Sequence, residues 1–367
     1  MKVLMVSTDE KILQKGSEVQ KRMEEYGSLI DELNIIVFSK SNKQIDLDNN
    51  VKVFSTNSSY KIFYFRDGIY TAKKNIKSDI DLVTCQDPFE TGLAGWMISK
   101  KLKAKLQLQI HTDFLSPYFS RESLKNKVRV WIAKYLLPKA DSIRVVSERI
   151  KKSVINLGLP EEKIILLPIF VDVEKIINTP TEVDLHDKYK QFDFILLMTS
   201  RFEPEKNIGM VIDSMKDLAK ENPKLGLLIV GDGSQKEKLQ RKVLDNKLDK
   251  NIIFERWVND LSSYHKTADV FINTSNYEGY GMSLIMAAAA GSPIITTDVG
   301  LVDEIIKHKE NGLVVLNNNK EKLVRAILRL MSDKALGEGL GKSAQDAVSK
   351  LDNKEEYLKK YKQSWEI

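Results

Sequence analysis

Cysteine and histidine are scarce in this chain of 367 residues, which contains one Cys and four His. Cys85 therefore cannot form a disulfide within the chain, and a lone Cys is typical of a protein of the reducing cytosol. No two His residues have metal-ligand spacing, so we expect no metal site and no cofactor. The sequence also shows no Ser-His-Asp or Cys-His pattern that would indicate a catalytic nucleophile.

Long hydrophobic runs are absent as well. The longest, from Met282 to Ile295, contains Gly291 and Pro293 and falls short of the ~18 apolar residues that a membrane span needs. The run that opens the chain, Met1 to Ser7, is too short for a signal peptide and predicts a strand instead. We therefore expect a cytoplasmic protein.

Neither sign of charge dominates, because 57 basic residues face 51 acidic ones and the net charge is +6. The excess is spread along the chain, which favours a solvated, lysine-rich surface. The alternative is a basic face that meets an anionic membrane or acceptor. No basic-aromatic recognition motif occurs, so nucleic acid is not an expected partner.

Short β-branched runs alternate with helical patterns, in one series between residues 3 and 167 and in a second between 194 and 316. Such alternation predicts parallel sheets covered by helices on both faces. The polar segment 171–191 separates the two series. We predict an N-terminal domain over 1–172 and a C-terminal domain over 173–350. A helix over 351–367, with aromatic residues four apart on one face, is expected to return to the first domain.

The strongest local motif runs from Glu278 to Pro293 and follows an expected strand. Gly279 and Gly281 favour a tight turn, and a helix is expected from Met282 because the next residues contain no helix breaker. The free N–H groups at the start of such a helix form an anion site suited to a diphosphate. The alternative is an ordinary strand-turn-helix that Glu278 caps.

Two cations, Arg201 and Lys206, flank another expected strand-to-helix loop. An arginine fork and a lysine point charge at a strand end suit a pyrophosphate. The alternative is a pair of surface cations, with Lys206 ion-paired to Glu203 or Glu205.

The first domain offers a glycine and a histidine at strand ends. Gly16 precedes Ser17 and Gln20, which match a capping box, and would let a phosphate or sugar approach the helix start. His111 directly follows an expected strand, where an imidazole can contact a sugar hydroxyl or phosphate. A turn glycine and a structural histidine are the alternatives.

In order and spacing these segments resemble glycosyltransferase family four over nearly the whole chain, most strongly from Ala140 to Val315. The resemblance is carried by ADSIRVVS at 140–147, PIFVD at 168–172 (without the glycine usual there), LIVGDG at 228–233 and GLVDE at 300–304, together with Arg201, Lys206 and Glu278. It implies the GT-B fold, in which two Rossmann-like domains face each other across a cleft and the C-terminal helix packs back.

The resemblance also implies a retaining, metal-independent hexosyltransferase that uses a UDP- or GDP-sugar. Its acceptor would be a glycan or lipid-linked molecule of cell-surface polysaccharide or glycolipid assembly. The implied roles are donor-sugar contact for Glu278, a place near the reacting sugar for His111, the acceptor-side loop for Gly16, and diphosphate binding for Arg201, Lys206 and the backbone of Gly281, Met282 and Ser283.

One departure from the family concerns Met286, which stands where the family has a second Glu that holds the nucleotide ribose. A thioether does not accept two hydroxyl donors as a carboxylate does. The loss is worth about 1.5–3 kcal/mol, or roughly ten- to a hundredfold in affinity. We expect other groups or water to hold the ribose. The alternative is an altered nucleotide preference or a weakened enzyme. The rival functions are a nucleotide-sugar epimerase on the same fold and a non-catalytic nucleotide-sugar-binding subunit, which Met286 also fits.

The segment 118–139 combines aromatic residues with six cations. One face of its expected helix carries Leu124, Val128, Trp131, Ile132, Tyr135 and Leu136. Basic amphipathic helices lie on anionic bilayers. In a doubly wound domain, however, this apolar face is expected to pack on the sheet. That would leave the loop Phe114–Phe119 and the cations for a peripheral contact with the inner face of the cell membrane.

Overall fold

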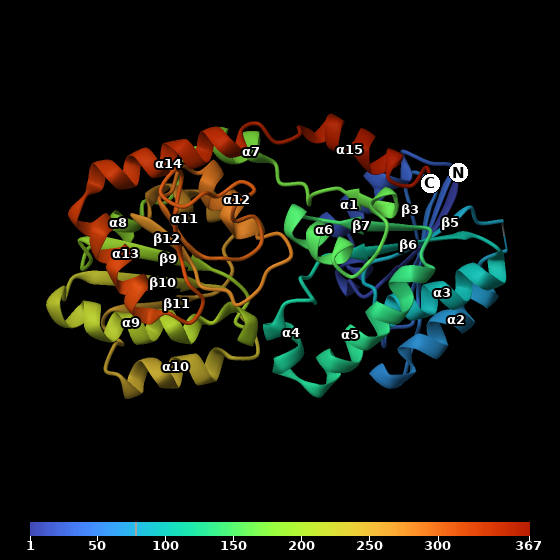
Figure 1. The fold of residues 1–367 in the computed structure, drawn as a ribbon, viewed down its shortest axis with the longest axis horizontal. Helices are drawn as coiled ribbons and strands as arrows, with labels where there is room; N and C mark the ends of the chain where they lie inside the picture. The colour runs from blue at the N-terminus through green and yellow to red at the C-terminus, as the bar shows by residue number, and fades with distance from the viewer. Residues whose placement is uncertain (78) are drawn as a thin grey trace. The chain divides into compact units, whose positions relative to one another are not determined.

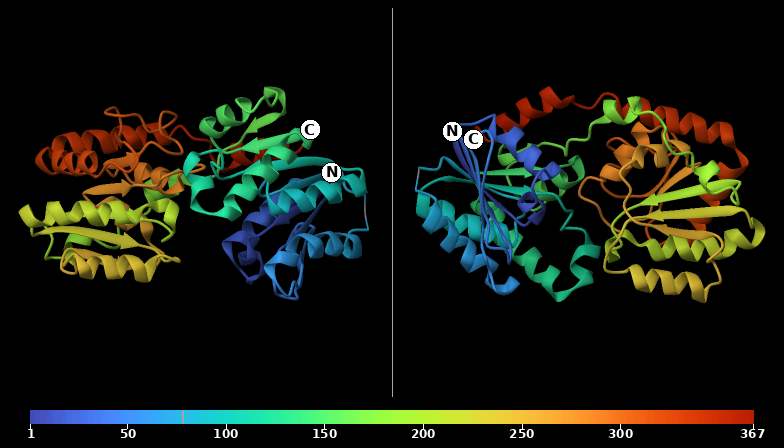
Figure 2. Two further views of the ribbon diagram at one scale, coloured as in Figure 1. Left: turned by 60° about the horizontal axis from the view of Figure 1, so that its bottom comes forward. Right: turned by 180° about the vertical axis from the view of Figure 1, so that it is seen from behind.

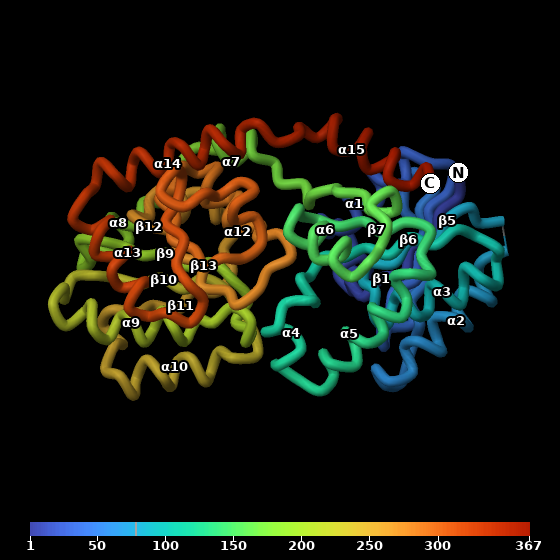
Figure 3. Tube along the Cα trace, in the orientation of Figure 1, coloured from blue at the N-terminus to red at the C-terminus, as the bar shows by residue number. Residues whose placement is uncertain are grey.

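The computed structural model describes residues 1–77 and 79–367 and divides into two compact units (Figure 1, Figure 3). The N-terminal unit contains Met1–Pro168 together with Lys354–Ile367, and the C-terminal unit contains Ile169–Asn353. Each unit is built on a mainly parallel sheet flanked by helices. The predicted fold class, two Rossmann-like α/β domains, is confirmed.

The N-terminal sheet has eight strands in the order β3-β4-β2-β1-β5-β6-β7-β8, and only β3 runs antiparallel to its neighbour. Its strands are β1 (Lys2–Ser7), β2 (Glu32–Val37), β3 (Gln44–Leu47), β4 (Val51–Ser55), β5 (Leu82–Cys85), β6 (Lys105–Ile110), β7 (Ser142–Val145) and β8 (Ile164–Leu166). Chain order reverses across β1, because β2 pairs on one side of it and β5 on the other. Ligand sites of such sheets lie at this switch point.

The hairpin β3–β4 at the sheet edge has no counterpart among the predicted strands. Its outer strand β3 has no buried residue, and β4 buries Val51 and Val53 while Lys52 stays exposed. Asn49 and Asn50 turn the chain between the strands, each with φ of 56°. Asparagine tolerates this left-handed conformation. A short polar edge strand therefore forms here without the β-branched run that usually indicates one.

Helices cover both faces of the N-terminal sheet. They are α1 (Glu18–Gly27), α2 (Tyr64–Asn75), α3 (Glu90–Leu102), α4 (Pro117–Glu122), α5 (Leu124–Leu136) and α6 (Glu148–Ile155). Helix α3 lies between α2 and α5 on one face (Figure 1, Figure 2). A Cβ added to Gly92 of α3 would lie 3.2 Å from Leu108 of β6 and 3.4 Å from Leu136 of α5, so these elements are closely packed.

The exposed side of α5 corrects the expectation that its apolar face packs on the sheet. Leu124, Val128, Trp131 and Tyr135 are 79%, 56%, 68% and 45% exposed. The loop expected to reach a membrane is not available, because Phe114 and Phe119 are buried. Phe119 instead stacks on Phe89 at a ring distance of 5.8 Å. Within the described residues, no helix combines the length and apolar character that crossing a membrane requires.

The C-terminal helix α15 (Lys354–Gln363) belongs to the N-terminal unit, as predicted. Tyr361 stacks on Tyr26 of α1 at a ring distance of 3.9 Å, and Trp365 is 1% exposed. The segment also covers the sheet, because the Gln107 amide donates to the Ser364 carbonyl at 2.5 Å. The aromatic face read from the sequence is thus the packing face of this helix.

The C-terminal unit has a six-stranded parallel sheet in the order β11-β10-β9-β12-β13-β14. Its strands are β9 (Phe194–Thr199), β10 (Leu225–Val230), β11 (Ile252–Glu255), β12 (Val270–Asn273), β13 (Ile294–Thr297) and β14 (Leu313–Val315). Its helices are α7 (Val173–Asn178), α8 (Leu185–Lys188), α9 (Ile208–Glu221), α10 (Lys236–Asp245), α11 (Leu261–Thr267), α12 (Met282–Ala289), α13 (Lys320–Ser332) and α14 (Lys334–Val348). Chain order reverses between β9 and β12.

Candidate active site

The loops that follow β9 and β12 meet at the switch point of the C-terminal sheet. The Thr274 hydroxyl donates to the Lys206 carbonyl at 3.1 Å, and the Asn276 amide donates to the Glu205 carbonyl at 2.7 Å. These contacts join the two segments that the sequence singled out separately. The structure therefore brings Arg201, Lys206, Glu278 and the start of α12 to one edge of one sheet.

Lys206 and Glu278 form an ion pair with 2.5 Å between Nζ and Oε1. Their side chains are only 13% and 14% exposed. The Ser275 hydroxyl lies 2.7 Å from the same oxygen of Glu278. The partner of Lys206 is thus Glu278, and not Glu203 or Glu205, the two alternatives in the nearby sequence. The Glu278 carboxylate therefore has a fixed orientation, because Lys206 and Ser275 both contact it where little water reaches.

Arg201 differs from Lys206 in its exposure. Its guanidinium donates to Glu205 at 3.2 Å, yet the Arg201 side chain is 69% exposed. An exposed pair of this kind contributes little to stability, and the arginine is easily redirected to a ligand.

Helix α12 begins where the sequence predicts, with Gly281 as its N-cap at φ of 98°. The first amides of a helix lack partners within it, so those at the start of α12 are available to an anion. Met282 is 45% exposed and Ser283 is half-buried. Met286 lies one turn further along the helix and is half-buried, so no carboxylate stands at the position where the family binds ribose.

Gly300 lies against the turn that carries Glu278. It adopts φ of 54°, and an added Cβ would lie 2.3 Å from the Tyr280 carbonyl oxygen and 3.2 Å from Cβ of Glu278. The Leu301 amide donates to the same carbonyl at 3.1 Å. The segment 300–304, which carries part of the family resemblance, therefore supports the turn before α12 directly.

Replacing Gly300 by alanine is expected to destabilise the protein by about 1–3 kcal/mol and to weaken donor binding, since both the backbone strain and the clash fall on this turn. Gly158→Ala is the matched control, because Gly158 has φ of 88° but nothing within 4 Å of an added Cβ. Thermal unfolding and donor titration measure both effects. Equal behaviour of the two variants would contradict the steric role of Gly300.

His111 and Gly16 belong to the N-terminal unit. Gly16 has φ of 72°, and Ser17 caps α1 by accepting from the Gln20 amide at 3.2 Å, as predicted. His111 follows β6, and its Nε2 lies 2.9 Å from Oε1 of Gln109. Burial, with the guanidinium groups of Arg144 and Arg22 nearby, lowers the pKa of His111 to about 3. The imidazole is therefore neutral near pH 7.

The tautomer of His111 follows from the hydrogen bonds of Gln109. Oε1 of Gln109 also accepts from Arg144 at 3.2 Å, while its amide nitrogen donates to Thr84 at 2.8 Å. Oε1 is thus the acceptor, so Nε2 of His111 carries the proton and Nδ1 is left as an acceptor. Arg144 is 3% exposed and also donates to the Tyr357 hydroxyl of α15 at 3.3 Å.

Asp87 is a candidate that the sequence analysis missed. It follows β5 at the switch point of the N-terminal sheet, and its Oδ1 accepts from the Phe89 amide at 2.7 Å. Burial, together with the nearby Glu90 carboxylate, raises the pKa of Asp87 to about 6. A single aspartate without a motif carries no sequence signal for such a shift.

Asp87→Asn is expected to stabilise the protein relative to the wild type at pH 8 but not at pH 4. The folded-state pKa exceeds the unfolded value of about 3.9, so the contribution of the bound proton is lost as pH rises from about 4 through 6. The predicted difference between the two pH values is about 1–3 kcal/mol. Urea unfolding at both pH values tests this, with the exposed Asp249→Asn as control. A pH-independent effect of Asp87→Asn would contradict the assignment.

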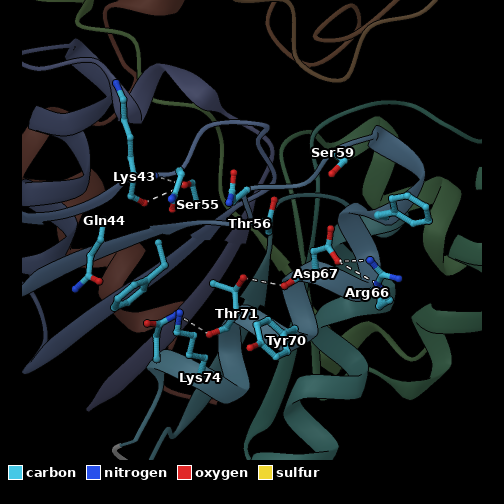
Figure 4. Close-up of a pocket in the computed structure, with 15 residues that line it drawn as sticks. Lys43, Gln44, Ser55, Thr56, Ser59, Arg66, Asp67, Tyr70, Thr71 and Lys74 are labelled. Atoms are coloured by element: carbon cyan, nitrogen blue, oxygen red, sulfur yellow. Dashed lines mark hydrogen bonds and ion pairs between the residues drawn. The ribbon is translucent and has the colours of Figure 1, made fainter.

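A polar pocket of about 420 Å³ lies between the β3–β4 hairpin and α2 (Figure 4). In it Arg66 pairs with Asp67 at 3.0 Å, and the Thr71 hydroxyl donates to the Asp67 carbonyl at 2.8 Å. None of the predicted site residues lines this pocket. Over residues 1–77 and 79–367, His, Cys, Asp and Glu side chains form no group of three that could hold a metal ion.

Comparison with known proteins gives two matches to family models. Residues 35–175 match glycosyltransferase family 4, and residues 186–347 match glycosyl transferases group 1. The chain is 26% identical over 300 residues to an uncharacterized glycosyltransferase of Methanocaldococcus jannaschii, covering 79% of this chain and 76% of the relative. It is 24% identical over 316 residues to the alpha-monoglucosyldiacylglycerol synthase of Streptococcus pneumoniae, covering 81% and 70%.

Among solved structures, the Anabaena protein HepE in complex with UDP-glucose has the same fold, with a TM-score of 0.76 at 19% identity over 100% of this chain and 98% of that one. The two family models match consecutive parts of the chain, the first almost wholly in the N-terminal unit and the second in the C-terminal unit. The chain therefore belongs to glycosyltransferase family 4 and is a glycosyltransferase with two Rossmann-like domains.

Proposed function

We propose that this enzyme transfers a hexose from a UDP- or GDP-sugar to a lipid-linked or glycan acceptor, with retention of configuration and without a metal ion. The observation that carries the proposal is the Lys206–Glu278 pair beside the start of α12. A leaving diphosphate needs positive charge around it. This charge would come from Lys206, from Arg201 turned away from Glu205, and from the free amides at the start of α12. A metal ion is not required for that purpose.

Glu278 is proposed to accept hydroxyl hydrogens of the donor sugar, since Lys206 and Ser275 fix its carboxylate at 2.5 and 2.7 Å. The neutral His111 offers Nδ1 as an acceptor for a hydroxyl of the reacting sugar. In the transfer, the acceptor oxygen bonds to the anomeric carbon as the bond to the diphosphate breaks. The acceptor proton passes to the departing phosphate oxygen on the same face, which gives retention.

The Anabaena protein forms a complex with UDP-glucose, which supports a nucleotide-sugar donor. The name of the Streptococcus enzyme contains a glucosylated diacylglycerol, which supports a lipid acceptor. With Met286 in place of the ribose carboxylate, the ribose is held by other groups or by water.

A thermal-shift screen against UDP-, GDP-, ADP- and CMP-sugars identifies the donor, because a ligand of the native state raises the melting temperature. Transfer is then measured with EDTA present, and proton NMR of the product gives its anomeric configuration. Inversion at the anomeric carbon, or activity only after a divalent cation is restored, would contradict the proposal.

We further propose that the enzyme works on the inner face of the cell membrane, through the exposed stripe Leu124–Val128–Trp131–Tyr135 of α5 (the α5 stripe). Trp131 and Tyr135 stack at a ring distance of 6.0 Å, and Nζ of Lys139 lies 4.2 Å from the Tyr135 ring. Aromatic side chains beside lysines are typical of membrane interfaces, where ring and cation reach different depths. The positive charge favours an anionic bilayer.

Trp131→Ser is expected to weaken binding to anionic liposomes by about ten- to a hundredfold, since a buried indole ring contributes about 1.5–3 kcal/mol. Co-sedimentation at low and high salt measures this. Trp257→Ser is the matched control, because Trp257 is 50% exposed but lies in the C-terminal unit. If the wild type does not pellet with anionic vesicles at low salt, the enzyme does not use this surface for membrane binding.

A further inference from the structure

A cavity of about 850 Å³ in the N-terminal unit lies at the carboxyl ends of β1 and β2, beside the switch point of the sheet. Its lining includes Thr8 after β1, Ser39 after β2 and Glu90 at the start of α3. None of the residues predicted for the donor site lines it. This is nevertheless the place in a doubly wound domain where a ligand is expected.

The cavity is positively charged. Its lining contains Lys40, Lys61, Lys125 and Arg129, against the carboxylates of Glu10 and Glu90. Nε of Arg129 lies 3.0 Å from both oxygens of Glu90, and Nζ of Lys125 lies 3.4 Å from one of them. The Glu90 carboxylate is therefore already neutralised by two cations.

Lys40 and Lys61 are the cations left to receive a ligand, because neither has an ion pair within residues 1–77 and 79–367. The pocket of Figure 4 has about half the volume of this cavity, and Lys74 is its one cation without a partner among the described residues. There Arg66 pairs with Asp67, and Nζ of Lys43 donates to the Leu13 carbonyl at 3.2 Å. The larger cavity offers more room and two such lysines, which favours an anionic ligand such as a phosphate group.

One side of the cavity is bordered by exposed apolar residues. Ile62 lines it and is 82% exposed. On α5, Lys125 and Arg129 form a row beside Leu124 and Val128 of the α5 stripe, since each cation follows an apolar residue by one position. A ligand with an anionic head group and hydrocarbon chains could contact the cations with its head group and the apolar residues with its chains.

We propose that this cavity binds the phosphate-bearing head group of a membrane lipid that serves as the sugar acceptor, while its chains stay in the bilayer beside the α5 stripe. The inference rests on the proposed function, since it names the acceptor class of that reaction. Strand β1 is separated from β6, which His111 follows, by β5 alone. Two strand spacings amount to about 10 Å, which places the β1 end of the cavity near the region of His111.

The experiment uses sn-glycerol 1-phosphate as a soluble probe of the head group, with binding followed by ³¹P NMR at low salt. We expect saturable binding to the wild type and at least about tenfold weaker binding to the double variant Lys40→Ser/Lys61→Ser. The control Lys73→Ser/Lys152→Ser removes the same charge from exposed positions of α2 and α6 that do not line the cavity. It is expected to bind the probe as the wild type does.

If the control loses as much affinity for the probe, the loss comes from the lower overall charge of the protein, and the proposal is wrong. Inorganic phosphate that binds as tightly as glycerol phosphate would overturn the lipid assignment. In vesicles, phosphatidylglycerol is expected to protect the Lys40 and Lys61 amines of the wild type from acetylation, and phosphatidylcholine is not. Donor binding is recorded for every variant. If the wild type does not bind the donor, the proposed transferase reaction is wrong. Binding of the probe would still test whether the cavity takes a head group.

Discussion

Replacing Glu278 by glutamine is expected to lower kcat by about ten- to a hundredfold. The charged carboxylate is assigned to donor-sugar hydroxyls, and charge-assisted hydrogen bonds of this kind contribute about 1.5–3 kcal/mol. Glutamine keeps the shape of the side chain but loses the ionic partner of Lys206, which lies 2.5 Å away and is largely buried. Steady-state kinetics with the preferred donor measures the effect, with donor affinity determined separately by calorimetry.

Glu255→Gln is the matched control for this variant. Glu255 also pairs with a lysine, Lys188 at 2.9 Å, but it ends β11 at the far edge of the C-terminal sheet. Its replacement is expected to leave kcat within about twofold. A Glu278→Gln enzyme that is folded and turns over like the control would remove Glu278 from the reaction.

Arg144→Leu is expected to destabilise the N-terminal unit by at least about 3 kcal/mol. The buried guanidinium donates to the carbonyls of Leu167 and Pro168 at 3.4 and 3.3 Å and to the Tyr357 hydroxyl at 3.3 Å. Each buried acceptor left without a donor costs about 1–3 kcal/mol. The variant is also expected to turn over more slowly, because Gln109 loses the contact that fixes its amide and thereby the tautomer of His111.

Tryptophan fluorescence isolates the unit concerned. Of the four Trp residues only Trp257 lies in the C-terminal unit, so a Trp257→Phe background reports on the N-terminal unit alone. Urea unfolding of Arg144→Leu is compared with Arg121→Leu, which removes an exposed arginine of α4. Unchanged stability of the Arg144 variant would show that Arg144 is not needed to hold α15 on the sheet.

The regular parts of both sheets were predictable because their strands are buried on both faces and appear as continuous apolar runs. The two predicted series, 3–167 and 194–316, agree with the strands observed from Lys2 to Leu166 and from Phe194 to Val315. The edge hairpin β3–β4 was not predicted, because its exposed outer strand carries no hydrophobic pattern. Local periodicity cannot detect a strand whose stability comes from its neighbour.

The candidate site was predictable residue by residue but not in its pairings. Strand-to-helix loops with Arg201, Lys206 and Glu278 follow from local patterns, whereas the ion pair between Lys206 and Glu278 depends on β12 lying beside β9. For Asp87 the environment, not the residue type, produces the raised pKa. For α5 the sequence located the apolar face, but the choice between sheet and solvent depends on the tertiary contacts of α3.

The return of α15 to the N-terminal unit reverses the order in which the two units are completed during synthesis. The ribosome must make all of Ile169–Asn353 before the segment that covers Arg144 and Tyr26 exists. At about 5–20 residues per second, that interval lasts roughly 10–40 s. Throughout it, a buried cation of the finished protein lacks its tyrosine partners. The unit that leaves the ribosome first is therefore the last to reach its full stability.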